Sequence, residues 1–278
     1  MQARCVDIAE PDEMSDVYAY HEGDAPLLLS VPHDGWQIPA DILHNMSGPA
    51  RGIPDTDWHV SQLYEFARDF GASTIVASYS RYVVDLNRPA DDGALYENQV
   101  ATGVCPTQTF AGDSIYLDDP KIDIASRVAR YWRPYHDRLA AALTAIRERH
   151  GYALLWDAHS IRSQVPRLFP GELPVLNLGT WDHRSCDVTI ANAVYAAAAA
   201  SQYSAVMNGR FRGGYITRHY GRPDANIHAL QLELTQRAYM NESTLEYDKT
   251  KAAELALTLR DMLQRFLEAA KAVQTVFI

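Results

Sequence analysis

The segment YALLWDAHS (152–160) decides the fold class. A short apolar run leads directly into Asp157 and His159, which is typical of a buried strand that ends in polar residues. Two further segments have the same character, PLLLSVPHDG (26–35) and PVLNLGT (174–180). Because strands of this kind occur in sheets covered by helices, the three segments point to an α/β protein.

Helical patterns separate these strands. DTDWHVSQLYEFARDFG (55–71) has apolar residues at helical spacing, and residues 123–150 form an amphipathic pattern that Pro134 is expected to kink or divide. We also expect helices over 187–201 and 247–273, and strands within 73–89 and 228–236. The alternation of strand and helix predicts a sheet with helices on both faces.

The chain carries no linker and no internal repeat. We therefore expect one catalytic domain over residues 1–278, interrupted by a loop-like insertion at about residues 90–119. Loops of that length in compact domains are often lids or binding loops.

The composition excludes several classes of protein. Of the 278 residues, 47% are hydrophobic and 22% are charged, as in globular proteins and unlike disordered or fibrous chains. No apolar run approaches the roughly 18–20 residues of a membrane-spanning helix, so no membrane association is expected. The net charge of −10 disfavours nucleic acid as a partner, because nucleic-acid binders normally carry a basic excess.

The cellular location expected from the sequence is the cytoplasm. The first residues, MQARCVDIAEPDEM, carry acids where a signal peptide would carry an apolar stretch. The three cysteines are widely spaced and fit neither a disulfide framework nor a CxxC metal motif, so a reducing compartment is expected. The sequence is compatible with a homo-oligomer and does not fix the oligomeric state.

Polar residues gather where the predicted strands end. His33 follows the first strand, Asn87 and Arg88 follow the second, and Asp157 and His159 follow the third. Ligands in α/β sheets bind beyond the carboxyl ends of the strands. Two histidines from separate strand ends and one carboxylate form a zinc site with an open fourth position, although each histidine alone is more often an ordinary surface residue.

The third ligand is open between two aspartates. Asp57 begins the helix that follows the His33 loop and is our first choice, whereas Asp55 is the competing choice or the cap of that helix. Asp34 and Asp157 could be ligands or could orient a ligating histidine.

Glu233 is the candidate general base. In HALQLELTQ (228–236) leucines alternate with polar residues, so Glu233 points away from the face that buries the leucines. The simpler interpretation is a glutamate on a solvent-facing strand. If a metal is present, such a carboxylate could take a proton from water and pass it to a leaving amine.

Arginines near the strand ends indicate a small anionic substrate. Arg81, Arg88, Arg218 and Arg222 occur in RYVVDLNRP and GGYITRHYGRP, beside turn or strand-end signals. Arginine suits bidentate recognition of carboxylates, although any one of them could instead form a surface ion pair.

Several blocks together resemble the N-formylglutamate amidohydrolases. The blocks, in chain order, are SVPHDGWQIP, DTDWHV, SRYVVDLNRP, WDAHS, NLGT, GGYITRHYGRP and LQLELTQRAYM, and the resemblance runs from about Pro26 to about Glu242. It implies a fold similar to the zinc carboxypeptidases and other phosphorylase/hydrolase-like proteins: a mixed, mostly parallel sheet flanked by helices on both faces. It also implies hydrolysis of N-formyl-L-glutamate to formate and L-glutamate in histidine degradation.

The resemblance also implies roles for individual residues. His33, His159 and Asp57 would hold Zn²⁺ or another divalent metal, while Trp36 stands where carboxypeptidases place a glutamate ligand. Glu233 would be the general base. Asn87 and Arg88 would bind one carboxylate of the substrate. For the mechanism on which the residues and the resemblance agree, we expect Arg218 first among the candidates for the other carboxylate and Arg81 at the developing oxyanion.

Two other functions fit the same residues. The scaffold could hydrolyse another N-acyl amino acid or a short peptide, because the sequence does not show the size of the acyl pocket. The chain could also be a non-catalytic amino-acid-binding protein, but the presence of a candidate base beside the candidate ligands disfavours that alternative.

Overall fold

A computed structural model describes residues 16–93, 102–118 and 121–275. Within these ranges seven strands form one sheet in the order β1-β3-β2-β4-β7-β5-β6. The strands are β1 Tyr18–His21, β2 Leu27–Val31, β3 Ser73–Ala77, β4 Ala153–Ile161, β5 Leu176–Gly179, β6 Ala205–Met207 and β7 Ile227–Thr235. The β1–β3 and β5–β7 pairs are antiparallel and the other neighbouring pairs are parallel, which confirms the expected mixed, mostly parallel sheet.

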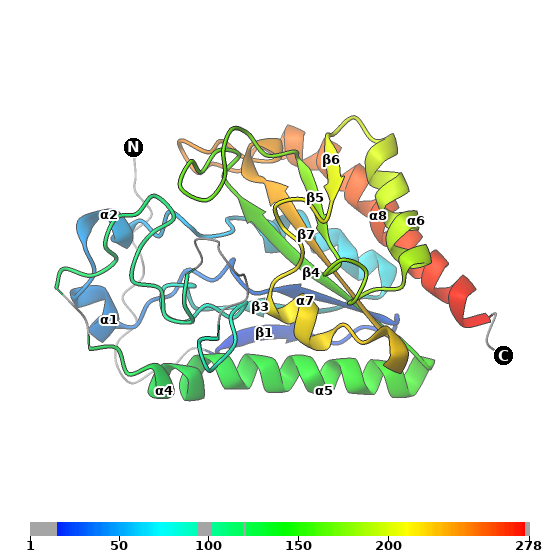
Figure 1. Ribbon diagram of the computed structural model, residues 1–278, viewed down its shortest axis with the longest axis horizontal. Helices are drawn as coiled ribbons and strands as arrows, with labels where there is room; N and C mark the ends of the chain where they lie inside the picture. The colour runs from blue at the N-terminus through cyan, green and yellow to red at the C-terminus, as the bar shows by residue number, and fades with distance from the viewer. Residues whose placement is uncertain (1–15, 94–101, 119–120, 276–278) are drawn as a thin grey trace.

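Helices cover both faces of the sheet (Figure 1). The α-helices are α1 Ala40–His44, α2 Gly48–Arg51, α3 Val60–Leu63, α4 Ile124–Arg127, α5 Arg133–His150, α6 Val188–Ala200, α7 Tyr215–Tyr220 and α8 Lys249–Thr275. Short 3₁₀ segments span Glu65–Phe70, Pro223–Ala225 and Gln236–Ala238, and a π-helical turn spans Val128–Trp132. None of the described helices is long and apolar enough to cross a membrane.

Each face of the sheet has its own hydrophobic core. On one face α6 and α8 pack together over Trp156 and the leucines of β7. On the other face α5 packs over Leu28, Leu155 and Ala229. Because β2 and β4 are buried from both sides, they begin as apolar runs rather than as half-exposed alternating strands.

The alternation along β4 assigns the site to one face. Leu154, Trp156 and Ala158 join the core under α6 and α8, whereas Leu155 joins the core under α5. Side chains two residues apart point to the same face of a strand, so His159 lies on the α5 side. The same parity on β7 places Glu233 on that side, opposite the leucine face, as the sequence predicts.

Three local expectations can be compared with the structure in detail. The strand expected within residues 73–89 ends at Ala77, and the rest is a buried, turn-rich segment. Pro134 does divide the helix over 123–150: it lacks an N–H donor, and the π-helical turn lies immediately before it. Within the insertion at 90–119, the described part packs Val104, Ile115 and Tyr116 into the core, while 94–101 and 119 lie outside the described residues.

Candidate metal centre and substrate pocket

Three buried side chains meet at the carboxyl edge of the sheet. His33 follows the end of β2, His159 lies near the end of β4, and Asp57 lies in the loop before α3. One nitrogen or oxygen atom from each of the three lies within 4.8 Å of the others. The Asp57 N–H donates to the His33 carbonyl at 3.0 Å, which fixes the two loops relative to each other.

Asp57 rather than Asp55 completes this triad. Its Oδ2 lies 3.1 Å from His159 Nδ1 and 3.6 Å from His33 Nδ1. The Asp55 carboxylate instead accepts hydrogen bonds from the Tyr82 hydroxyl at 2.6 Å and the Phe110 N–H at 2.8 Å. Asp55 therefore anchors the insertion to the site.

A second carboxylate lies behind each histidine. His33 Nε2 is 2.8 Å from Asp85 Oδ1, and His159 Nε2 is 3.2 Å from Asp157 Oδ1. Carboxylates in this position hold a ligating imidazole in one orientation with its other nitrogen directed at the metal. Asp157 thus lies where a carboxylate that orients His159 would lie, one of the two roles that the sequence left open for it. Asp85 was not predicted, although it lies in the same SRYVVDLNRP block as the predicted Asn87 and Arg88.

The donor atoms of the triad fit a metal cation. His33 Nδ1 and Asp57 Oδ1 are buried and make no hydrogen bond. Buried polar atoms are rarely left without a partner, so the pair indicates that something else binds there. Two imidazole nitrogens and one carboxylate oxygen form a donor set typical of catalytic zinc, which leaves a position open for substrate.

Charge at the triad favours a cation as well. Burial alone would raise the pKa of Asp57, but His159 and His33 lower it below its ordinary value. Burial alone would lower the pKa of His159, but Asp157 and Asp57 raise it well above its ordinary value. The carboxylates therefore stabilise positive charge at the place where a metal would lie.

Arg81 lies beside the triad, as expected. Its guanidinium donates to Asp85 Oδ2 at 2.7 Å and lies 3.5 Å from Asp57 Oδ1. The guanidinium carbon is 4.7 Å from the centre of the Phe110 ring. Burial alone would raise the pKa of Asp85, but Arg81 and then His33 hold it well below its ordinary value.

Glu233 lies next to the triad and not on a solvent-facing strand. It pairs with His159 in the register of β4 and β7, and it is only 7% exposed. Burial raises the pKa of Glu233 to about 8. A carboxylate with a pKa near neutral can both accept and donate a proton, which is what general acid–base catalysis requires.

Asn87 is locked in place at the floor of the pocket. Its Oδ1 accepts the Ile216 N–H at 2.8 Å, and its Nδ2 lies 3.1 Å from His159 Nε2. A Cβ atom on Gly214 would lie 2.3 Å from the Asn87 Nδ2 atom. Glycine is therefore required at 214 for Asn87 to occupy this position.

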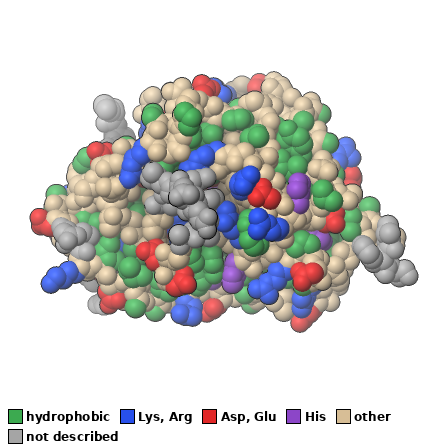
Figure 2. Space-filling model, viewed as in Figure 1, with side chains coloured by type: hydrophobic (Ala, Val, Ile, Leu, Met, Phe, Trp, Pro, Cys, Tyr) green, Lys and Arg blue, Asp and Glu red, His purple; other side chains and the backbone are tan. Residues whose placement is uncertain are grey.

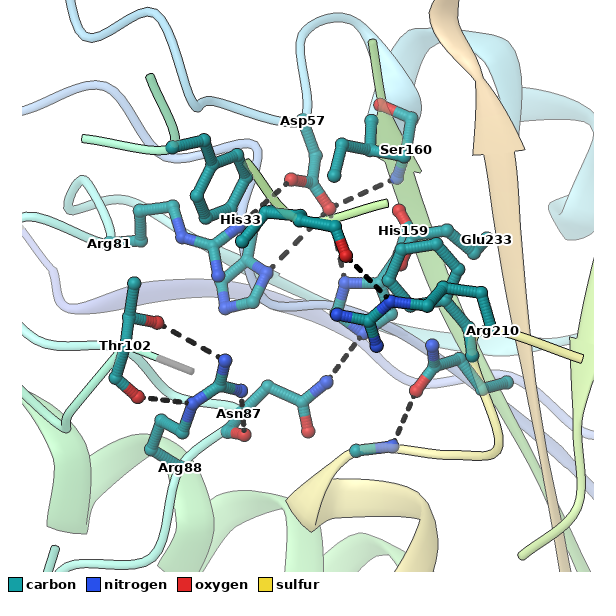
Figure 3. Close-up of a pocket in the computed structure, with 16 residues that line it drawn as sticks. His33, Asp57, Arg81, Asn87, Arg88, Thr102, His159, Ser160, Arg210 and Glu233 are labelled. Atoms are coloured by element: carbon teal, nitrogen blue, oxygen red, sulfur yellow. Dashed lines mark hydrogen bonds and ion pairs between the residues drawn. The ribbon is translucent and has the colours of Figure 1, made fainter. Parts of the chain in front are cut away.

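Two arginines reach into the pocket from different sides (Figure 3). Arg88 donates to the Thr102 carbonyl at 2.7 Å and to the Thr102 hydroxyl at 3.1 Å. Arg210 donates from Nε to the Leu168 carbonyl at 3.0 Å. Figure 2 shows Lys and Arg side chains gathered near the centre of the face in view.

One pocket brings together most of the residues that the sequence singled out, together with several that it did not. Its lining includes the predicted His33, Asp57, Arg81, Asn87, Arg88, His159 and Glu233. Among the described residues that line the pocket, Arg218 is absent. Its Nε donates to the Gly213 carbonyl, and its guanidinium carbon is 5.9 Å from the centre of the Trp181 ring. The unpredicted lining residues include Thr102, Phe110, Arg210 and Phe211. Of these, Arg210 had the clearest sequence signal, because it lies three residues before the first glycine of the GGYITRHYGRP block.

The chain is similar to known proteins over most of its length. The chain is 47% identical over 259 residues to the N-formylglutamate deformylase of Pseudomonas putida, an alignment that covers 91% of this chain and 97% of that protein. It is 45% identical to the N-formylglutamate deformylase of Pseudomonas aeruginosa, with the same coverage.

Solved structures show the same fold. The crystal structure of N-formylglutamate amidohydrolase from Ralstonia eutropha superimposes with a TM-score of 0.76 at 26% identity, and covers 93% of this chain and 98% of that one. A gene product of Agrobacterium tumefaciens superimposes with a TM-score of 0.69 at 18% identity, covering 95% and 97%, and shares the fold. Residues 25–240 match the family described as N-formylglutamate amidohydrolase. The chain therefore belongs to the N-formylglutamate amidohydrolase family.

Proposed function

We propose that this protein hydrolyses N-formyl-L-glutamate to formate and L-glutamate in a metal-dependent reaction. The observation that carries the proposal is the buried His33, Asp57 and His159 triad with Glu233 beside it. The relatives named N-formylglutamate deformylase support the choice of substrate. Zinc is the metal we propose, with cobalt, manganese or iron as other divalent candidates. We also propose a place in histidine degradation, in the cytoplasm.

The triad would hold the metal through His33 Nδ1, His159 Nδ1 and the Asp57 carboxylate. A divalent metal there would supply Lewis-acid chemistry, which polarises the formyl carbonyl and makes water more acidic. Asp85 and Asp157 keep the two imidazoles turned toward it. These contacts hold the ligands in place before the substrate arrives.

Glu233 moves the proton in this reaction. Its carboxylate accepts a proton from the attacking water as the water oxygen bonds to the formyl carbon. When the carbon–nitrogen bond breaks, the same carboxylic acid delivers that proton to the departing amine. The products are formate and glutamate, and Glu233 returns to its starting charge.

The arginines and Asn87 bind and stabilise the substrate. Asn87 and Arg88, which both line the pocket, would bind the α-carboxylate, which is next to the amide that breaks. Arg81 is fixed by Asp85 and Asp57, so its charge is already oriented when the oxyanion develops on the formyl oxygen.

Formate release from N-formyl-L-glutamate tests the proposal. We expect release by the purified protein, loss of release with a chelator, and recovery when zinc is added back. N-acetyl- and N-succinyl-glutamate serve as comparison substrates. If either comparison substrate were hydrolysed faster than N-formyl-L-glutamate, the enzyme would be assigned to that acyl group instead. The absence of turnover with every substrate and metal would contradict the proposal.

Substitution of the base separates chemistry from binding. Glu233→Gln should lower kcat by about 10²-fold or more, because general-base catalysis typically contributes 10²–10⁴-fold. The exposed Glu254 on α8 provides the matched control, and Glu254→Gln should leave kcat unchanged. Near-wild-type turnover in Glu233→Gln would remove Glu233 from the mechanism.

Asp85→Asn should weaken metal binding by about 10–100-fold, because the neutral amide no longer stabilises His33 as a ligand. Competition with a chromogenic chelator measures this affinity directly. Asp224→Asn, at an exposed position, is the control. Unchanged zinc affinity in Asp85→Asn would contradict the assigned role of Asp85.

Glu233 also makes stability depend on pH in the chelator-treated protein. Its pKa is about 8 when folded and about 4.3 when unfolded, so between these values the folded state binds more protons. This group therefore makes the folded state less stable as pH rises through that window, by up to about 1.4 kcal/mol per pH unit.

Glu233→Gln removes that titration. The free energy of unfolding of the variant, relative to wild type, should rise between pH 5 and pH 8, as chemical denaturation would show. Glu254→Gln should run parallel to wild type. A constant difference between Glu233→Gln and wild type across this range would show that Glu233 stays ionised when folded.

A further inference from the structure

We propose that Arg210 binds the side-chain carboxylate of the substrate and makes the pocket selective for an acidic side chain. The inference rests on the proposed function and deepens it, since it names the group that distinguishes N-formylglutamate from other N-formyl amino acids. It replaces Arg218, the arginine that the sequence favoured for this role.

The substrate requires two cationic contacts. N-formylglutamate carries an α-carboxylate and a side-chain carboxylate, and transfer of a carboxylate out of water is strongly unfavourable unless it gains a partner. Asn87 and Arg88 account for the α-carboxylate. A second cation must therefore lie within the length of a glutamate side chain.

Three arginines line the pocket where the structure describes it: Arg81, Arg88 and Arg210. Arg81 already lies between the carboxylates of Asp85 and Asp57, so most of its charge is compensated. Arg88 and Arg210 both line the pocket, and in the view of Figure 3 they are drawn on either side of the Asn87 amide. A substrate with one carboxylate on Arg88 can direct its other carboxylate toward Arg210.

The loop that carries Arg210 is fixed at both ends. At its start, the Asn208 N–H donates to the Leu178 carbonyl at 2.7 Å, and Asn208 Oδ1 accepts the Thr180 N–H at 2.9 Å. At its end, the Gly214 N–H donates to Gln231 Oε1 at 2.6 Å. These bonds tie the loop to the sheet, so the loop backbone loses little conformational entropy when Arg210 binds an anion.

The surroundings of Arg210 suit a glutamate side chain. Leu168, whose carbonyl accepts the Arg210 Nε–H, lines the pocket together with Phe211 and Ile161. Apolar groups of this kind can pack against the two methylene groups of glutamate. They also lower the local dielectric, which strengthens the pairing of a carboxylate with a guanidinium.

The two neighbouring arginines are placed differently. Arg212 is exposed, and its guanidinium lies 3.3 Å from an Asp182 carboxylate oxygen. Arg218 lies on α7, where its Nε donates to the Gly213 carbonyl at 2.8 Å. Neither is among the described residues that line the pocket.

A comparison of two substrates tests the assignment. N-formyl-L-glutamine has the size of N-formyl-L-glutamate but lacks the side-chain charge, so the ratio of kcat/KM between the two substrates isolates recognition of that charge. With the zinc-loaded enzyme, Arg210→Met should lower this ratio by about 10²-fold, as expected for a desolvated charge pair. Arg210→Lys keeps a cation and should lower it by about tenfold or less.

Two further variants serve as comparisons. Arg212→Met, on the same loop, should keep the wild-type ratio within about threefold. Arg218→Met tests the competing arginine. Circular dichroism and zinc content establish that each variant is folded. If Arg210→Met does not fold, Arg210→Lys still tests the assignment.

Each contrary outcome has a distinct meaning. Equal loss of kcat/KM on both substrates in the Arg210 variants, or a collapse of the ratio in Arg218→Met instead, would overturn the assignment and leave the proposed function standing. If wild type released no formate from either substrate under any metal condition, the proposed function would fail and this assignment with it.

Discussion

The site depends on the pairing of buried charges. Three carboxylates, Asp57, Asp85 and Asp157, are buried at one edge of the sheet. Burial of such groups is costly unless each has partners, and the partners here are the two histidines and Arg81. Each carboxylate therefore restricts the orientation of a neighbouring side chain. Asp57 Oδ1 and His33 Nδ1, which lack hydrogen bonds, mark the centre of this arrangement.

The sheet provides the rigidity that this arrangement needs. β4 and β7 form a nine-residue parallel pair, and its register places His159 beside Glu233. Both strands are covered by helices on each face, so the two side chains project from a packed scaffold and not from a mobile loop. The flanking loops are in turn tied to the sheet, as the bond from the Asp57 N–H to the His33 carbonyl illustrates. The strands therefore hold His159 and Glu233, and the loops beside them supply His33 and Asp57.

Much of the fold and part of the site could be predicted from the sequence. The apolar runs before His33 and His159 identify buried strands, and the alternation around Glu233 identifies its face. The choice between Asp55 and Asp57 could not be made, because the two residues lie in one loop whose path depends on long-range hydrogen bonds. Asp57 meets the His33 loop, whereas Asp55 meets Tyr82 and Phe110.

The arginines show the same limit of sequence-based prediction. Arg210, Arg212 and Arg218 lie within nine residues of one another, and all are close to the same recognisable block. Their different environments arise from the left-handed backbone at Asn208 and the glycines that follow, which sequence periodicity does not reveal. Asp85 was not predicted for a related reason. Residues 78–89 form a mostly buried irregular segment, so neither the two-residue spacing of a strand nor the 3.6-residue spacing of a helix indicates where its side chains point.

The central claim is that the buried triad is a metal site formed by His33 Nδ1, His159 Nδ1 and the Asp57 carboxylate. Anomalous diffraction at the zinc edge, from crystals of the zinc-loaded protein, tests it most directly. The account predicts one peak bonded to these three side chains at about 2.0–2.2 Å, with Asp85 and Asp157 still contacting the opposite nitrogens of the histidines. No peak at the triad, or a zinc ion bound elsewhere through Asp55, would contradict it.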